Sequence, residues 1–378
     1  MQMTGVTSRT KEKFRSLSRA LTRSFPTPTI MLPVAAGIDI SDASVKWLVL
    51  DRSASEFRIK TFGEIAIPPG VVERGVVRDV EGLSQALRHV KENLGGVTCA
   101  HAALPEESAY VFGMRVPPQT PRDQVLRMIE FEFEGRVPIP PSAAVYDFNP
   151  IPSPKLEDQG EIAVVVFPRD IAEAYVASFE HAGLSLLSLE VEASSIARAI
   201  SEGTPDEPIT LLVDFGRART GFAVLKKGHP IFTSTVEVGG DQITHALMDM
   251  LSFSAEDAEA YKNNQGLIPA DGKTQQATEL ITKSATALAD EIARHYHYWD
   301  TRRNERGERV TPVGKVVIVG GNANIRGLPE FIAGRVQAPT SRGDVWRRIV
   351  SFDSYIPPIN RASSFQYATA VGLALRAI

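Results

Sequence analysis

Cysteine is almost absent from this chain of 378 residues, which contains Cys99 alone. A single thiol cannot form an internal disulfide and disfavours a metal site built from cysteines. The sequence also lacks any run approaching the roughly 20 uninterrupted apolar residues that a membrane-spanning helix needs, and its start lacks the continuous apolar core of a signal peptide. These absences favour a reducing compartment, and we expect a cytoplasmic protein.

A large net charge is also missing, because 41 basic residues face 45 acidic ones, for a formal net charge of −4. This balance argues against a nucleic-acid partner. Residues 1–34 differ from the rest, with six basic residues against one acidic residue and apolar residues at Phe14, Leu17, Leu21 and Phe25. The spacing predicts a basic amphipathic helix at residues 9–25, suited to an anionic membrane surface or to a groove of a partner protein. A disordered tail is the alternative.

The remaining chain has the composition of a globular protein, long enough for two or more cores. Residues 37–50 indicate an apolar strand, a polar turn and a second strand, with Asp39, Ser41, Ser44 and Lys46 at the bend. Small side chains there leave backbone N–H groups free to approach an anion, and the acid can hold a hydrated cation. A plain solvated hairpin is the alternative, since Asp and Ser are ordinary turn residues.

The same pattern recurs at residues 209–238, where an apolar strand ends in Asp214 and a glycine-containing turn leads to another strand. A hydroxyl follows each acid by five or six residues, at Ser44 and at Thr220, so we infer an internal repeat. A third strand runs into Gly320-Gly321. Glycine turns after strands let backbone amides contact phosphate or a flat ring. The three turns together predict a nucleotide–magnesium site between two halves of the chain.

Residues 97–189 alternate strands and helices and predict a small α+β unit of their own. Within it, Thr120 and Pro121 favour a helix start with the Thr120 hydroxyl as its cap, and the helix runs to about Glu134. Further helices are predicted at residues 82–93, 191–201, 254–261, 275–300 and 365–377.

The turns at residues 37–46, 213–220 and 319–321 resemble the two phosphate motifs and the adenosine motif of the actin/Hsp70/FtsA superfamily. Other segments resemble the PilM-type type IV pilus assembly proteins, namely residues 130–140, residues 182–184 with Glu192 and Arg198, residues 253–262 and residues 370–376. The resemblance covers residues 36–378. It implies an α/β fold of the bilobed actin-like (RNase H-like) ATPase type, with two duplicated subdomains and an inserted small α+β subdomain as in FtsA.

The predicted organisation has six parts. They are the tail (1–34), the first part of the first lobe (35–96), the inserted subdomain (97–189), a connecting helix and linker (190–208), the second lobe (209–355) and a C-terminal helix returning to the first lobe (356–378).

The resemblance also implies ATP and Mg²⁺ as cofactors, with Asp39 and Asp214 holding the metal through water. Glu259 and Lys262 would lie near the ribose and base, and Glu192 would orient a water as the one catalytic candidate. The full predicted cofactor-binding set is Asp39, Ser41, Ser44, Val45, Lys46, Asp214, Gly216, Thr220, Glu259, Lys262, Gly320, Gly321 and Asn322. The alternatives are an exposed strand lysine at Lys46, a solvated helix face at Glu259 and a helix cap at Glu192.

Two departures from the family pattern bear on hydrolysis. Ser41 stands where the family usually has glycine, and Arg217 and Arg219 enlarge a turn that is commonly small. These arginines could pair with phosphate oxygens or face solvent. No residue offers itself as a base for activating water. We therefore expect ATP binding with slow or absent hydrolysis.

The function that the resemblance implies is that of a cytoplasmic scaffold, peripheral at the inner membrane, in the type IV pilus machine. Its implied partners are the N-terminal peptide of a PilN-like membrane protein and other inner-membrane pilus components. The helix at residues 122–136 is a candidate wall of the peptide groove. The alternatives are an FtsA-like cell-division filament scaffold, for which we expect a C-terminal membrane anchor, and a true ATPase or a sugar kinase, for which we find no separate aspartate base.

Overall fold

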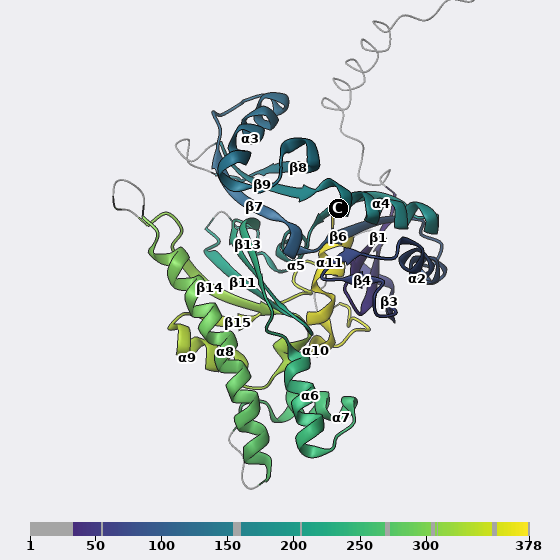
Figure 1. The fold of residues 1–378 in the computed structure, drawn as a ribbon, viewed down its shortest axis with the longest axis vertical. Coiled ribbons are helices and arrows are strands. Elements are labelled where there is room, and N and C mark those ends of the chain that lie inside the picture. The colour runs from purple at the N-terminus through teal and green to yellow at the C-terminus, as the bar shows by residue number, and fades with distance from the viewer. Residues whose placement is uncertain are drawn as a thin grey trace, which may run out of the picture.

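The computed structural model describes residues 33–376, except 54–55, 154–159, 205, 269–272, 304–306, 308 and 350–353. The predicted amphipathic helix at residues 9–25 lies outside the described residues. The described chain forms two lobes, each built around a five-stranded sheet, with a small three-stranded unit above them and a helix pair at the lower end (Figure 1). No helix among the described residues is both long and apolar enough to cross a membrane.

The first lobe contains a sheet in the order β10-β6-β1-β2-β3. Its strands are β1 (Ala35–Ile40), β2 (Ser44–Ser53), β3 (Glu56–Ala66), β6 (Cys99–Leu104) and β10 (Ser185–Val191). The first three form an antiparallel meander, and β6 runs parallel to β1. Helices α2 (Val80–Asn93) and α4 (Arg169–Ala182) pack together over one face, where side chains such as Ile38 and Val49 are fully buried.

The second lobe repeats this connectivity. Its sheet has the order β13-β12-β11-β14-β15, formed by β11 (Ile209–Phe215), β12 (Thr220–Lys226), β13 (His229–Val236), β14 (Val313–Val319) and β15 (Thr340–Arg342). Again an antiparallel meander is followed by a strand parallel to its first member, β14 beside β11. The internal repeat predicted from the sequence is therefore confirmed.

Among the described residues, helices α6, α7, α8 and α9 complete the second lobe. The long α8 (Lys273–Thr301) packs against α9 (Leu328–Val336) and contacts β11 and β14. Helices α6 (Gly240–Leu251) and α7 (Ala255–Gln265) form the pair at the lower end of Figure 1. The backbone N–H of Asp257 donates to Ser254 Oγ at 3.1 Å, so Ser254 caps α7.

The inserted unit is smaller than the sequence predicted. It consists of β7 (Tyr110–Arg115), α3 (Arg122–Arg136), β8 (Ala144–Pro150) and β9 (Glu161–Pro168), in the sheet order β7-β9-β8. The prediction of residues 97–189 was wrong at both ends, because β6 and β10 pair with each other and with the first lobe's sheet. An apolar run predicts a buried strand but does not say which sheet that strand joins.

The start of α3 also differs from the prediction. The helix begins at Arg122, and no side chain caps it. The Thr120 hydroxyl instead donates to the Pro117 carbonyl at 2.6 Å. The predicted Thr120 cap is therefore wrong, because the preceding turn uses the hydroxyl.

The C-terminal segment returns to the first lobe. It comprises α10 (Arg361–Ser364), the short helix η6 (Phe365–Tyr367) and α11 (Ala368–Ala374). Helix α11 packs on β1 and on α5 (Glu192–Ile200). The approach is backbone to backbone, since a Cβ at Gly372 would lie 1.7 Å from the Ser195 carbonyl oxygen and one at Gly37 would lie 2.0 Å from the Ala370 carbonyl oxygen. Two glycines thus fix α11 against the first lobe.

Candidate functional site

The first turn of the site follows β1 and is closed by its own serine. Ser41 donates from its backbone N–H to the Ser44 carbonyl at 2.9 Å and from its hydroxyl to the same oxygen at 3.0 Å. The Ser44 backbone N–H donates to Ser41 Oγ at 3.2 Å. The residue that departs from the family pattern therefore serves as the side-chain brace of this turn.

The second turn follows β11 and is packed against the start of α6. Gly216 donates to the Arg219 carbonyl at 3.0 Å, and Asp241 donates to the Arg217 carbonyl at 2.9 Å. A Cβ at Gly239 would lie 2.2 Å from the Arg217 carbonyl oxygen. The turn and the N-terminus of α6 are therefore in direct backbone contact.

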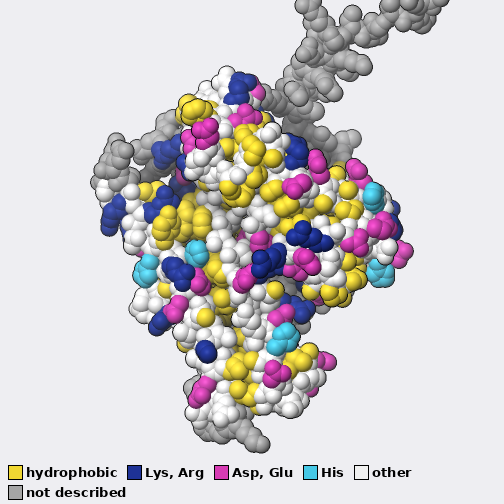
Figure 2. Space-filling model, in the orientation of Figure 1, with side chains coloured by type: hydrophobic (Ala, Val, Ile, Leu, Met, Phe, Trp, Pro, Cys, Tyr) yellow, Lys and Arg dark blue, Asp and Glu magenta, His cyan; other side chains and the backbone are white. Residues whose placement is uncertain are grey.

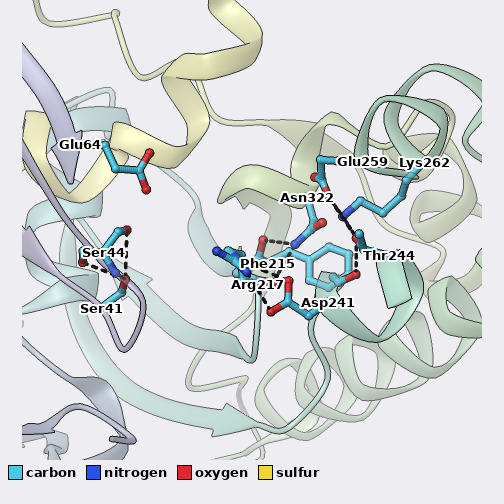
Figure 3. A network of polar contacts seen from close by, with 12 residues as sticks. Ser41, Ser44, Glu64, Phe215, Arg217, Asp241, Thr244, Glu259, Lys262 and Asn322 are labelled. Atoms are coloured by element: carbon cyan, nitrogen blue, oxygen red, sulfur yellow. Dashed lines mark hydrogen bonds and ion pairs between the residues drawn. The ribbon is translucent and has the colours of Figure 1, made fainter. Parts of the chain in front are cut away.

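The third turn follows β14 and leads into the short helix η5 (Gly321–Asn324). Gly320 has a φ of +85°, and a Cβ there would lie 2.4 Å from Asp214 Oδ1. Asn322 Nδ2 donates to the carbonyls of Phe215 at 3.3 Å and Gly216 at 2.7 Å (Figure 3). Glycine is required at position 320 by both its φ and its contact, and Asn322 ties the third turn to the second.

A cavity of about 240 Å³ lies between the first turn and the other two. Figure 3 shows Ser41, Ser44 and Glu64 on one side and the Arg217, Asp241 and Asn322 group on the other. In Figure 2, acidic and basic side chains gather near the middle of the face, over the boundary between the lobes. The predicted site residues that line the cavity are Asp39, Ser41, Lys46, Glu192, Asp214, Gly216, Gly320 and Gly321.

Several members of the predicted cofactor-binding set do not line this cavity. Val45 is fully buried in the first lobe, and Thr220 is fully buried with its hydroxyl donating to the Val238 carbonyl at 2.6 Å. Ser44 accepts a hydrogen bond from Lys46 Nζ at 3.0 Å. Asn322 is 2% exposed and braces the second turn as described. The side chains of these four residues support the turns.

Glu259 and Lys262 form a pair that lies outside the cavity lining. Lys262 Nζ donates to Glu259 Oε2 at 2.6 Å and to Thr244 Oγ1 at 3.0 Å, so the pair links α7 to α6 (Figure 3). Burial lowers the pKa of Lys262, and the bond to Glu259 opposes that shift. The pair lies beyond Asn322 as seen from Ser41, on the same side of the cavity as the third turn.

Four carboxyl groups converge on the deep part of the cavity. Burial, joined by repulsion from Asp39, raises the pKa of Asp214 to about 7. Burial and the Asp214 charge raise the pKa of Glu106 to about 8. The pKa values of Asp39 and Glu192 are also raised, first by burial and then by neighbouring charges, against which Lys46 acts. Such a cluster favours uptake of a proton or a cation.

The arrangement of the cluster bears on how it could hold a cation. Among the described residues, no group of three or more histidine, cysteine or acidic side chains is arranged to hold a metal ion. A hydrated cation fits better, because hard oxygen donors suit Mg²⁺ and this ion usually keeps several of its waters. Thr235 also lines the cavity, and its Oγ1 is buried without a hydrogen-bond partner in the described structure. The donor set therefore fits a hydrated magnesium ion.

Glu106 and Glu107 line the cavity but are not among the site residues predicted from the sequence. Both belong to the short helix η2 (Glu106–Ser108), just after β6. Glu106 is 7% exposed, and its Oε1 accepts from the Ala193 N–H in the first turn of α5 at 2.7 Å. A signal was present. Asp39 and Asp214 lie at the ends of buried strands and these acids lie just beyond one, and ends of parallel neighbouring strands meet at one sheet edge.

Glu106→Gln is expected to stabilise the nucleotide-free protein at pH 8, by an amount on the order of 2 kcal/mol. The folded-state pKa of about 8 lies above the ordinary value of 4.5. The wild-type protein therefore loses stability as pH rises from 4.5 to 8, whereas glutamine has no proton to lose and keeps the Ala193 hydrogen bond. Urea unfolding in chelator at pH 5 and pH 8 measures this. Equal stabilities of variant and wild type at both pH values would contradict the assignment.

The two lobes of matching strand order, with paired hairpin turns and a glycine turn around one cavity, define the actin-like ATPase fold. The chain belongs to the PilM family: the profile of the family described as type IV pilus assembly protein PilM matches residues 37–378. The predicted fold class and family are thereby confirmed.

Known structures and relatives agree with this assignment. The structure of the PilM-PilN type IV pilus biogenesis complex has a TM-score of 0.72 at 19% identity, covering 91% of this chain and 98% of that one. MreB5 of Spiroplasma citri bound to ADP has a TM-score of 0.53 at 13% identity, covering 92% and 96%. The cell division protein FtsA of Streptococcus pneumoniae is 23% identical over 332 residues, 78% of this chain and 72% of that protein. At these identities the solved structures support the fold.

Proposed function

We propose that this protein is a scaffold of type IV pilus assembly that binds Mg-ATP in the cavity between its lobes. The observation that carries the proposal is the convergence of Asp39 and Asp214, from equivalent strand ends of the two repeated sheets, on one cavity beside Gly320 and Gly321. Two symmetric turns facing one glycine turn suit a ligand with an anionic end and a flat end.

Different residues of the cavity would bind different parts of Mg-ATP. The backbone N–H groups of the first and second turns, with Lys46, would hold the phosphates. Asp39 and Asp214 would hold the hydrated magnesium, which supplies the positive charge that neutralises the phosphate chain. The base would lie over Gly321, where a Cβ would meet no atom within 4 Å and the space is open. Glu259 and Lys262 would close the site on the side of α6 and α7.

Binding should require the divalent cation. Eight acidic side chains and three basic ones line the cavity. The acids are Asp39, Asp42, Glu64, Glu106, Glu107, Glu192, Asp214 and Asp241, and the basic residues are Lys46, Arg217 and Arg219. Lys46 is moreover engaged with Glu64 at 3.1 Å. A bare polyphosphate would meet net repulsion there, and magnesium removes it.

Hydrolysis is proposed to be slow or absent. A general base must be able to accept a proton at the working pH. Burial, first of all, raises the pKa of Glu192. Burial and the Asp214 charge raise the pKa of Glu106 to about 8, so this carboxyl is largely protonated around neutral pH in the nucleotide-free protein. ATP would then act by its occupancy of the cleft, shifting the balance between lobe arrangements rather than being consumed.

The proposed partner is the cytoplasmic N-terminal peptide of a PilN-like inner-membrane protein, which would hold the scaffold at the inner membrane beside other pilus components. The similar PilM-PilN complex supports this proposal. In the present chain the inserted unit offers α3, whose Phe131 is 86% exposed, beside the edge strand β8. An extended peptide can pair with such an edge and place apolar side chains against the helix.

Gly321→Leu tests the ligand site without disturbing the fold. The added side chain enters open space at the proposed base position, so stability should be unchanged while Mg-ATP affinity falls by about tenfold or more. The measurement is isothermal titration calorimetry beside a thermal melt. The matched control is Gly334→Leu on α9, which also meets no atom within 4 Å and is remote from the cavity lining. Unchanged Mg-ATP affinity in the Gly321 variant would show that the base does not lie over Gly321.

A further inference from the structure

One arginine of the second turn reaches across the cavity to the first lobe. The Arg219 guanidinium forms ion pairs with two carboxylates, Asp42 in the first turn and Glu107 in η2. Its side chain is only 17% exposed. A single cation from the second lobe thus joins two separate loops of the first lobe.

The first of these carboxylates is itself held in place. Asp42 Oδ1 accepts from the Gly75 N–H at 2.9 Å, and Oδ2 accepts from the Arg74 N–H at 3.1 Å, both between the short strands β4 (Val72–Glu73) and β5 (Val76–Val77). Glu107, in contrast, has Arg219 as its one ion-pair partner among the described residues. Glu107 is therefore the partner that can leave Arg219 with less disturbance of the first lobe.

The neighbouring Arg217 provides an internal comparison. It belongs to the same turn and also lines the cavity, but its Nε pairs with Asp241 Oδ1 at 3.2 Å, within the second lobe. Its side chain is 72% exposed. The two arginines of this turn therefore differ in exposure and in partner, and of the two only Arg219 pairs with the first lobe.

Phosphate competes with carboxylate for a guanidinium. The planar group matches two oxygens of either anion, and such charge-assisted pairs are roughly twice as strong as neutral hydrogen bonds. The cavity of about 240 Å³ is slightly smaller than the roughly 300–1,000 Å³ typical of small-molecule sites. A polyphosphate entering between the turns would meet Arg219 already occupied, and the lobes already tied.

We propose that Arg219 is a phosphate-sensing latch: without nucleotide it ties the lobes through Asp42 and Glu107, and the nucleotide's phosphate chain takes the guanidinium from Glu107. Phosphate binding and release of the Arg219–Glu107 tie are then one exchange, while the Arg219–Asp42 pair remains. Because the anion replaces one partner by another on the same cation, the two arrangements compete and a modest difference in affinity shifts their populations. The latch rests on the proposed nucleotide site and adds to it the residue through which the site acts on the lobes.

Two substitutions should change nucleotide affinity in opposite directions. In the full chain, Arg219→Gln should weaken Mg-ATP binding by about tenfold or more, because the phosphate loses its guanidinium. Glu107→Gln should strengthen binding by about threefold to tenfold, because the neutral amide competes less for Arg219. Arg219→Lys, which keeps the charge but not the planar fork, should lie between wild type and Arg219→Gln. Arg217→Gln controls for loss of one positive charge and should weaken binding less than Arg219→Gln.

The titrations distinguish a failure of the latch proposal from a failure of the proposed nucleotide site. One outcome is that wild type binds Mg-ATP while Glu107→Gln weakens binding as Arg219→Gln does. In that case the Arg219–Glu107 pair supports the binding site, and competition between Glu107 and phosphate for Arg219 is refuted. If Arg219→Gln binds as wild type does, or no worse than Arg217→Gln, phosphate does not use this guanidinium and the latch is again refuted. If wild type itself fails to bind Mg-ATP, the proposed function is refuted and the latch with it.

Discussion

Asp39→Asn is expected to raise the thermal unfolding temperature of the nucleotide-free protein and to lower its affinity for Mg-ATP by about 100-fold. The stability gain follows from burial, which raises the pKa of Asp39 against the opposing charge of Lys46 and is reinforced by Glu64. Asparagine removes the buried charge without changing the shape of the side chain. The affinity loss follows because a neutral amide holds a hydrated magnesium ion poorly. Functional sites commonly show this opposition between stability and binding.

Asp249→Asn is the control for Asp39→Asn, since it removes one acid from an exposed position on α6 outside the cavity lining. Neither its melting temperature nor its affinity should change measurably. A melting temperature of Asp39→Asn below that of wild type, measured in chelator, would show that the Asp39 charge stabilises the fold. That result would contradict the claim that burial of the four converging carboxyl groups destabilises the nucleotide-free protein.

Gly372→Ala is expected to destabilise the protein by about 3 kcal/mol or more, because the new methyl group has no room. A Cβ there would lie 1.7 Å from the Ser195 carbonyl oxygen. Relief requires α11 to move away from α5, and with it the segment carrying Phe365 and Thr369, which line the cavity. Urea unfolding measures the loss of stability, and the same variant should bind Mg-ATP more weakly.

Gly334→Ala makes the same substitution in another helix, where we expect it to raise the stability of the protein instead of lowering it. Gly334 lies in α9, and a Cβ there meets no atom within 4 Å. Replacing glycine by alanine in an open helix position should stabilise the protein by about 0.5–1 kcal/mol. Similar changes in both variants would mean that α11 does not pack on α5 as described.

Local patterns explain why much of the fold could be predicted. Strands that end in an acid followed by a small-residue turn are visible in a short window, so the hairpins at Asp39 and Asp214 and their repetition were found. The membership of β6 and β10 was not found, because pairing between strands far apart in the chain leaves no local signature. The inserted unit was therefore predicted at residues 97–189, whereas its strands and helix span Tyr110–Pro168.

Local sequence patterns predicted only some of the side chains of the site. Resemblance placed Asp39, Lys46, Asp214 and Gly320 by their position in a motif, and these residues line the cavity. Val45 belongs to the same motif, but alternation along β2 turns its side chain to the opposite face from Lys46. The acids after β6 and the bridging role of Arg219 depend on contacts between distant segments, which no motif records.

The central claim is a magnesium-dependent nucleotide site between the lobes, and the most direct measurement is calorimetric titration of the full chain with ATP. Wild type should bind one ATP in excess Mg²⁺ and show no measurable binding in chelator, while Asp39→Asn should show the loss stated above. Equal binding by wild type with and without Mg²⁺, or equal binding by wild type and Asp39→Asn, would contradict the account.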